Sequence, residues 1–157
     1  MSPQNASAAA PGQDRPMEIL LVEDNEGDVV LAVEAFKTLK ISYNVTVASD
    51  GEQALAMLRR EAPYENQVRP DFILLDLNLP KRDGREVLES IKRDPELRGI
   101  PVVVLSGSRA EAEIAKSYAL YANAYVVKPV NFDRFKEIVS AIEAFFFSVV
   151  ALQRHAS

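Results

Sequence analysis

Three acids, a hydroxyl and a lysine are the residues of this chain whose types and spacing could do chemistry together. Glu23 and Asp24 follow one short apolar segment, and Asp76 ends another. Ser106 and Lys128 end two further apolar segments. Two carboxylates about 4 Å apart repel by roughly 4 kcal/mol at an effective dielectric near 20, so such a group needs protons or a cation. Mg2+ fits, because it prefers oxygen ligands and keeps positions for water and phosphate oxygens.

The same five residues supply what a phosphoryl group needs. A carboxylate can attack phosphorus to form an acyl phosphate, a metal ion and a lysine can neutralise the phosphoryl oxygens, and a hydroxyl can donate a hydrogen bond. We therefore predict an aspartyl phosphate on Asp76. Taken alone, each residue has a simpler interpretation as a solvated strand end, a helix cap or a surface charge. Their combination at four segment ends favours the functional interpretation.

Five short segments rich in Val, Ile and Leu must position these side chains. They are residues 17–22, 43–48, 71–76, 101–106 and 124–127. Continuous apolar runs of this length are typical of strands that are buried on both faces of a parallel sheet. The sequence therefore predicts five parallel strands.

Amphipathic segments of helical length separate the predicted strands. Apolar residues recur at helical spacing near 29–39, 51–61, 84–93 and 109–121, and again from Phe132 to Phe146. Five βα units with right-handed crossovers predict a flavodoxin-like, doubly wound α/β fold with strand order 2-1-3-4-5. Ligands of such folds bind at the carboxyl ends of the strands, beside the switch point between strands 1 and 3. The three acids are predicted to lie there.

Four segments resemble the receiver domain of two-component response regulators. They are LLVEDN (20–25), ILLDLNLPKRDGREVL (73–88), VVVLSGS (102–108) and AYVVKPV (124–130), in the family's order and spacing. The resemblance implies that Asp76 is the phosphoacceptor and that Lys128 contacts the phosphate. It also implies a Mg2+ site made by Asp24, Asp76, the backbone carbonyl of Asn78 and, through water, Glu23.

The resemblance assigns further roles to residues around the site. Ser106 matches the switch hydroxyl, where Thr is commoner, and Tyr125 matches the aromatic switch residue. Pro129 matches a proline that follows a cis peptide bond. Phosphorylation is expected to draw Ser106 toward the phosphate and let the Tyr125 ring turn inward. The fourth helix, fifth strand and fifth helix would then form the surface for output by protein binding. Tyr121 stands where receivers often carry Gly.

The phosphoryl group must come from another molecule. The single histidine, His155, lies near the carboxyl end, so it offers no phosphohistidine donor within the fold. By resemblance the donor is a histidine kinase or a phosphotransfer protein, with Mg2+ as cofactor. Residues 81–108 and the segment KPVNFDRF are similar to small stand-alone regulators that partner phytochrome-type, light-sensing kinases, bacteriophytochromes included.

Length and composition limit the classes of function. The chain has 157 residues, 48% of them hydrophobic and 26% charged, which suits one folded domain at 17–152 between tails at 1–16 and 153–157. A formal net charge of −5 gives no general attraction to nucleic acid or to an anionic membrane. No apolar run reaches the ~20 residues of a membrane span. The absence of cysteine fits a cytoplasmic protein. Translation from Met1 or from Met17 stays open.

The apolar carboxyl-terminal segment is the predicted interaction surface. Residues 141–152 contain two polar side chains, and three consecutive phenylalanines point in different directions around a helix. One stripe can pack on the sheet, and the others need a second cover. We predict a homodimer through a face that includes Phe145, Phe147 and Val150. The alternative is a helix that bends back and buries these side chains within one subunit.

Rival functions lack their motifs. A haloacid-dehalogenase-type phosphatase expects its nucleophile in a DxD pattern on the first strand, where this chain has Glu23, Asp24 and Asn25. A nucleotide carrier needs a phosphate-binding glycine loop, and no GxGxxG or P-loop is present. A DNA-binding protein needs a basic helix, whereas residues 81–98 mix both charges. We expect a signalling domain that catalyses only its own phosphorylation and dephosphorylation. The alternative is a scaffold of the same fold that never accepts phosphate.

Overall fold

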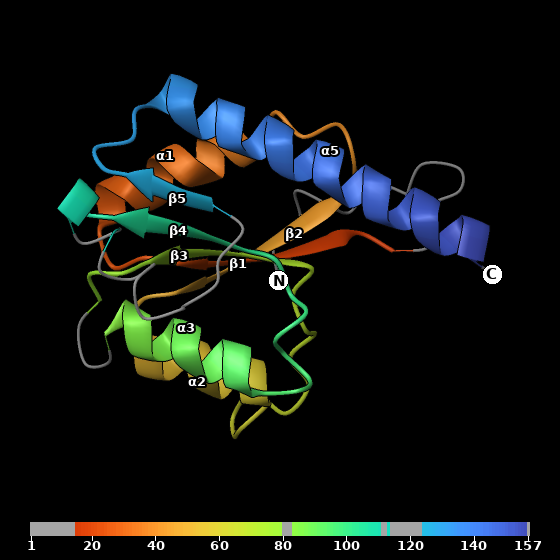
Figure 1. The fold of residues 1–157 in the computed structure, drawn as a ribbon, viewed down its shortest axis with the longest axis horizontal. Helices are drawn as coiled ribbons and strands as arrows, with labels where there is room; N and C mark the ends of the chain where they lie inside the picture. The colour runs from red at the N-terminus through yellow and green to blue at the C-terminus, as the bar shows by residue number, and fades with distance from the viewer. Residues whose placement is uncertain (1–14, 80–82, 111–112, 114–123, 157) are drawn as a thin grey trace.

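A parallel sheet of five strands forms the centre of the molecule (Figure 1). The computed structural model describes residues 15–79, 83–110, 113 and 124–156, with side chains up to residue 146. The strands are β1 (Met17–Val22), β2 (Tyr43–Ala48), β3 (Phe72–Asp76), β4 (Val102–Ser106) and β5 (Ala124–Val127). Their order is β2-β1-β3-β4-β5, which confirms the predicted doubly wound topology. β3 and β4 each begin one residue later than predicted, and Pro101 has no N–H to donate to the ladder.

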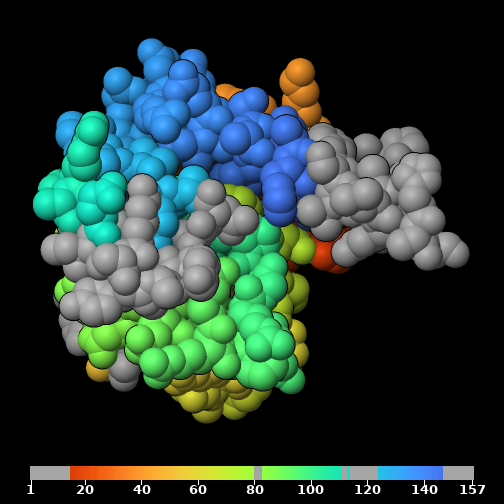
Figure 2. Space-filling model, viewed as in Figure 1, coloured from red at the N-terminus to blue at the C-terminus, as the bar shows by residue number. Residues whose placement is uncertain are grey.

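Helices cover both faces of the sheet. In Figure 1, α1 (Glu26–Phe36) and α5 (Phe132–Ala156) lie on one side, and α2 (Gly51–Arg59) and α3 (Gly84–Arg93) lie on the other. The space-filling view shows the blue surface of α5 and the green surface of α3 on opposite sides (Figure 2). The fourth helix predicted at 109–121 and Tyr121 fall largely outside the described residues.

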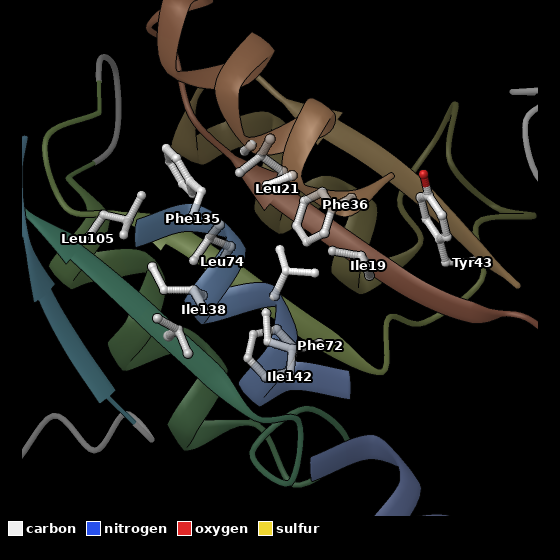
Figure 3. Close-up of a cluster of buried hydrophobic side chains, with 14 of the residues drawn as sticks. Ile19, Leu21, Phe36, Tyr43, Phe72, Leu74, Leu105, Phe135, Ile138 and Ile142 are labelled. Atoms are coloured by element: carbon white, nitrogen blue, oxygen red, sulfur yellow. The ribbon is translucent and has the colours of Figure 1, made fainter. Parts of the chain in front are cut away.

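Two apolar clusters, one on each face, explain why the strands have continuous apolar sequences. On the α1 and α5 side, Phe135 and Ile138 pack with alternate strand residues such as Leu21 and Leu74 (Figure 3). The intervening strand residues face α2 and α3; Leu75 lies there with Leu88. Because side chains alternate across a strand, both sets must be apolar when both faces are covered.

Asx residues begin the helices. The side-chain oxygens of Asn25, Asp50, Asp83 and Asn131 each accept a backbone N–H from the first turn of α1, α2, α3 and α5. At the other end of α2, Arg60 takes a left-handed conformation with φ 58°. The helix therefore ends at Arg59 and not at residue 61 as predicted.

The last helix is the longest described element. α5 has 25 residues, and in Figure 1 it runs past the end of the sheet. Within the described part of the chain, no helix combines the length and apolarity that crossing a membrane requires.

Candidate functional site

The three predicted acids lie together at the carboxyl edge of the sheet. Glu23 and Asp24 follow β1, Asp76 ends β3, and one carboxylate oxygen from each lies within 4.8 Å of the other two. Glu23 and Asp76 are each 1% exposed, whereas Asp24 faces solvent. We call these three residues the acid cluster. Two of its charges are therefore removed from water, and only the third is open to the surface.

The backbone around Asp76 is held from two sides. Leu77 N donates to Leu105 O across the sheet at 2.9 Å, and Gly84 N donates to Leu77 O at 3.0 Å. A Cβ at Gly84 would lie 2.4 Å from both Asp76 O and Leu77 Cα. Only glycine therefore allows the start of α3 to approach this backbone so closely. The Asp76 carboxylate is fixed locally as well, because Asn78 N donates to its Oδ1 at 3.0 Å.

Lys128 reaches the acid cluster from the end of β5. Its Nζ lies 3.0 Å from Asp76 Oδ2, 3.1 Å from Glu23 Oε1 and 3.0 Å from Asp28 Oδ2. An ammonium group has three N–H donors, so three carboxylates match its capacity. The peptide bond between Lys128 and Pro129 is cis. The structure thus brings Lys128 to the acids, with Asp28 as a partner that the sequence analysis missed.

Asp28 left only a weak signal in the sequence. It stands four residues after Asp24, one helical turn into α1, where acids are common because they favour the helix N-terminus. The sequence alone does not indicate how α1 is oriented relative to β5. The contact joins residues 100 positions apart in the chain.

Burial and charge shift the pKa values of two groups in the site. Burial, followed by the proximity of Asp76, raises the pKa of Glu23 to about 7, against the opposing effect of Lys128. Burial alone would lower the pKa of Lys128, but its bonds to Asp28, Asp76 and Glu23 outweigh this and raise that pKa above its usual range. Lys128 is therefore a permanent cation, while Glu23 titrates near neutral pH when no metal is bound.

The acid cluster fits a divalent cation. Glu23 Oε1 is buried, and none of the described residues donates a hydrogen bond to it, although Lys128 Nζ lies 3.1 Å away. A buried carboxylate oxygen without a hydrogen bond, beside two further carboxylates, is suited to a metal ligand. All three side chains offer oxygen, which is the donor preferred by hard cations.

Ser106 lies at the same edge of the sheet, but its hydroxyl makes its hydrogen bonds with Ser108 and not with the acid cluster. It ends β4 beside β3, where the register pairs Asp76 with Leu105, and it is fully buried. Its hydroxyl donates to Ser108 O and accepts from Ser108 N at 3.2 Å. The hydroxyl is thus held by its own loop.

Tyr125 lies on β5, opposite Val104 in the sheet register. It is half-buried and packs on the apolar cluster that faces α2 and α3. Burial raises the pKa of its phenol. The Tyr125 ring therefore already contacts the apolar cluster between the sheet and the helices α2 and α3. An inward turn of the ring would bury it more deeply in that cluster.

Part of the predicted dimer face can be described. Phe145 is 41% exposed, whereas its neighbour Phe146 packs on the core beneath α5. Phe145 borders a groove of about 260 Å³ between α5 and the sheet, which Phe72 and Val126 also line. The side chains of Phe147 and Val150 lie outside the described residues.

Comparisons with known proteins agree with this architecture. The model of the response regulator receiver domain matches residues 19–140. Response regulator Rcp1 of Synechocystis sp. is 46% identical over 137 residues, which cover 87% of this chain and 93% of Rcp1. The solved structure of the phosphorylated cyanobacterial phytochrome response regulator RcpA is 49% identical, with a TM-score of 0.77, over 86% of this chain and 96% of that one. The Mn2+-bound form of Rcp1 is 46% identical, with a TM-score of 0.74, over 83% and 94% of the two chains.

Proposed function

This chain belongs to the response regulator receiver family, and from that premise we propose that Asp76 accepts a phosphoryl group from a histidine kinase or a phosphotransfer protein. The observation that supports this role most directly is the contact of Lys128 Nζ with Asp76 Oδ2 at 3.0 Å, inside a cluster of acids. A carboxylate with a fixed cation beside it can receive a phosphoryl group whose charge is neutralised as it arrives. The chain is thus a signalling domain.

The transfer needs a nucleophile, a leaving group and charge compensation. An oxygen of the Asp76 carboxylate attacks phosphorus, the new O–P bond forms, and the P–N bond to the donor histidine breaks with its electron pair going to the imidazole nitrogen. Lys128 stays close enough to donate a hydrogen bond to a phosphoryl oxygen. Asn78 N donates a hydrogen bond to Asp76 Oδ1 and so limits rotation of the Asp76 side chain.

Receiver domains bind divalent metal ions, and we propose Mg2+ for this one. Asp24 and Asp76 would supply carboxylate oxygens, Asn78 its backbone carbonyl, and Glu23 a contact through water. The buried Glu23 Oε1, to which no described residue donates a hydrogen bond, supports the assignment. When bound, the ion supplies positive charge to the phosphoryl oxygens. The relative Rcp1 has a solved Mn2+-bound form, which also supports a divalent metal site here.

The signal is proposed to pass from Asp76 through Ser106 and Tyr125. The Ser106 hydroxyl has an acceptor on the backbone of Ser108, which it can exchange for a phosphate oxygen. The half-buried Tyr125 ring would then turn inward and alter the surface of β5 and α5. The fourth-helix part of this output surface lies outside the described residues.

Two partners complete the proposal. A phytochrome-type kinase is the favoured donor, because Rcp1 and the phytochrome response regulator RcpA are similar over most of this chain. A second copy of the chain is the favoured neighbour of α5, because the exposed Phe145 lies beside an apolar groove. Phe147 and Val150 remain part of that proposed face.

Incubation with acetyl phosphate and Mg2+, followed by intact mass measurement, tests the function. We expect the parent to gain one phosphoryl group and Asp76→Asn to gain none. Asp133→Asn, which removes an exposed acid from the start of α5, should behave as the parent. A parent that gains no phosphate under these conditions would favour the scaffold alternative. Omitting Mg2+ from the same reaction should suppress the gain.

A further inference from the structure

Among the residues that the structure describes, Asp28 is the one ion-pair partner of Lys128 that does not belong to the acid cluster. Its Oδ2 lies 3.0 Å from Lys128 Nζ, and the two side chains are 26% and 20% exposed. The acid cluster consists of Glu23, Asp24 and Asp76. Lys128 is therefore held by two acids of the cluster and by one acid outside it.

The helix cap that starts α1 fixes Asp28 in place. Asn25 Oδ1 accepts a hydrogen bond from Asp28 N at 2.9 Å, and Asn25 N donates to Glu23 Oε2 at 3.2 Å. The cap thus links the position of Asp28 to that of Glu23. Both bonds are local and hold the backbone of Asp28, from which its carboxylate reaches Lys128.

A divalent cation and Lys128 would share two of the same carboxylates. The acids available to the cation include Glu23 and Asp76, which are the two other partners of Lys128. A carboxylate that binds a metal ion is a weaker acceptor for an ammonium group, and a metal ion held by these acids would repel the Lys128 ammonium group. Without a further partner, Lys128 would be pushed away from Asp76 when it is needed there.

We propose that Asp28 is a positioning residue that keeps the Lys128 ammonium beside Asp76 when a cation occupies the acid cluster. The inference rests on the proposed function for its catalytic consequence, but the position of the ammonium group can be observed without any phosphorylation. Asp28 acts through Lys128 and does not contact the phosphoryl group.

Side-chain NMR of 15N-lysine-labelled protein tests the proposal directly. The Lys128 ammonium signal, assigned by its loss in Lys128→Arg, should exchange slowly with water in the parent with and without Mg2+. In Asp28→Asn it should stay protected in metal-free protein, where Glu23 and Asp76 remain partners. On addition of Mg2+ its exchange should accelerate by roughly tenfold, because the substitution removes the negative charge of one ion-pair partner.

A matched control separates position from charge. Glu26→Gln removes an exposed acid from the same first turn of α1 and should leave the Lys128 signal as in the parent. Asp28→Glu keeps the charge and should restore part of the protection. Equal exchange in the parent and in Asp28→Asn with Mg2+ bound would overturn the proposal. If Asp28→Asn does not fold, Asp28→Ser gives the same comparison.

Phosphorylation kinetics then measure the consequence. With acetyl phosphate, Asp28→Asn should lower the maximal rate by roughly tenfold. Its half-saturating Mg2+ concentration should shift no more than in Glu26→Gln. A loss confined to Mg2+ affinity would contradict a positioning role. A parent that is not phosphorylated would defeat the proposed function, while the ammonium exchange would still decide the role of Asp28.

Discussion

The carboxyl group of Glu23 is buried next to Asp76. The nearby Lys128 ammonium only partly offsets the effect of this burial and of the Asp76 charge on the pKa of Glu23. Burial and Asp76 raise its pKa to about 7, so the folded protein holds this proton more tightly than the unfolded chain does. The resulting stabilisation is fully present below the unfolded value of 4.5 and is lost as the pH rises through about 7. The metal-free site is therefore destabilised by its own ionisation at neutral pH.

Glu23→Gln should remove this pH dependence. Between about pH 5 and about pH 8, the free energy of unfolding of the metal-free parent should fall relative to that of Glu23→Gln by about 1 to 3 kcal/mol. Urea unfolding in the presence of a chelator, at several pH values, measures the difference. Saturating Mg2+ should abolish the fall in the parent. Parallel curves for the two metal-free proteins would show that Glu23 does not titrate in this range.

At the scale of the element, α3 is positioned by the absence of a side chain. The first residue of this helix, Gly84, packs so closely on the backbone of Asp76 and Leu77 that a Cβ would lie 2.4 Å from it. Because the contacted atoms are backbone and not the end of a flexible side chain, neither partner can give way cheaply. The packing of α3 therefore helps to fix the end of β3 that carries Asp76.

Gly84→Ala should destabilise the protein and disturb the site together. We expect a loss of about 1 to 3 kcal/mol in the free energy of unfolding, with a slower phosphorylation by acetyl phosphate. Gly99→Ala is the control, because nothing lies within 4 Å of a Cβ at that position. It should change the stability by less than about 0.5 kcal/mol. Equal effects of the two substitutions would mean that the close approach is not needed.

The strands and the bounds of α3 could be predicted because they depend on local sequence, whereas α1, at Glu26–Phe36, begins and ends earlier than the apolar pattern near 29–39. β1 and β2 begin and end as predicted, since apolar runs flanked by polar residues determine where both faces of a strand are buried. The end of α2 could not be predicted in the same way. Nothing in the residue type of Arg60 requires the left-handed conformation that stops the helix there.

The acid cluster was predictable for a different reason, and the rest of the site was not. Glu23, Asp24 and Asp76 all lie at strand ends, so the topology alone brings them together. The contact of Asp28 with Lys128 depends on how a helix and a strand far apart in the chain are oriented. The hydrogen bonds of Ser106 to Ser108 depend on the local loop backbone, which the sequence does not specify.

At the scale of the whole molecule, α5 has two roles. It covers one face of the sheet, and it presents an exposed apolar side chain to solvent. Its inner side packs on the core through Phe135 and Ile142. Further along the same helix, Phe145 is 41% exposed and borders the groove of about 260 Å³ between α5 and the sheet. A two-fold axis along such a helix places an exposed phenylalanine of each copy against an apolar surface of the other.

Phe145→Glu should therefore weaken self-association. Burying one phenylalanine side chain contributes about 1.5 to 3 kcal/mol, and a two-fold interface contains it twice, so the dissociation constant of the dimer should rise by roughly 100-fold or more. Light scattering over a range of concentrations measures the mass of the parent and the variant. Val30→Glu, at a 60% exposed apolar position on α1, is the matched control and should leave the dimer intact.

The light-scattering result distinguishes a dimer from a monomer whose α5 needs no second subunit to cover it. If the parent is monomeric at every concentration, α5 needs no second copy, and Phe145 is an isolated exposed side chain of a kind common on soluble proteins. If Phe145→Glu keeps the mass of a dimeric parent, the interface lies elsewhere. In that case Phe147→Glu and Val150→Glu test the same helix further along the chain. Dissociation by these two substitutions alone would place the interface on the carboxyl-terminal part of α5, after Phe145.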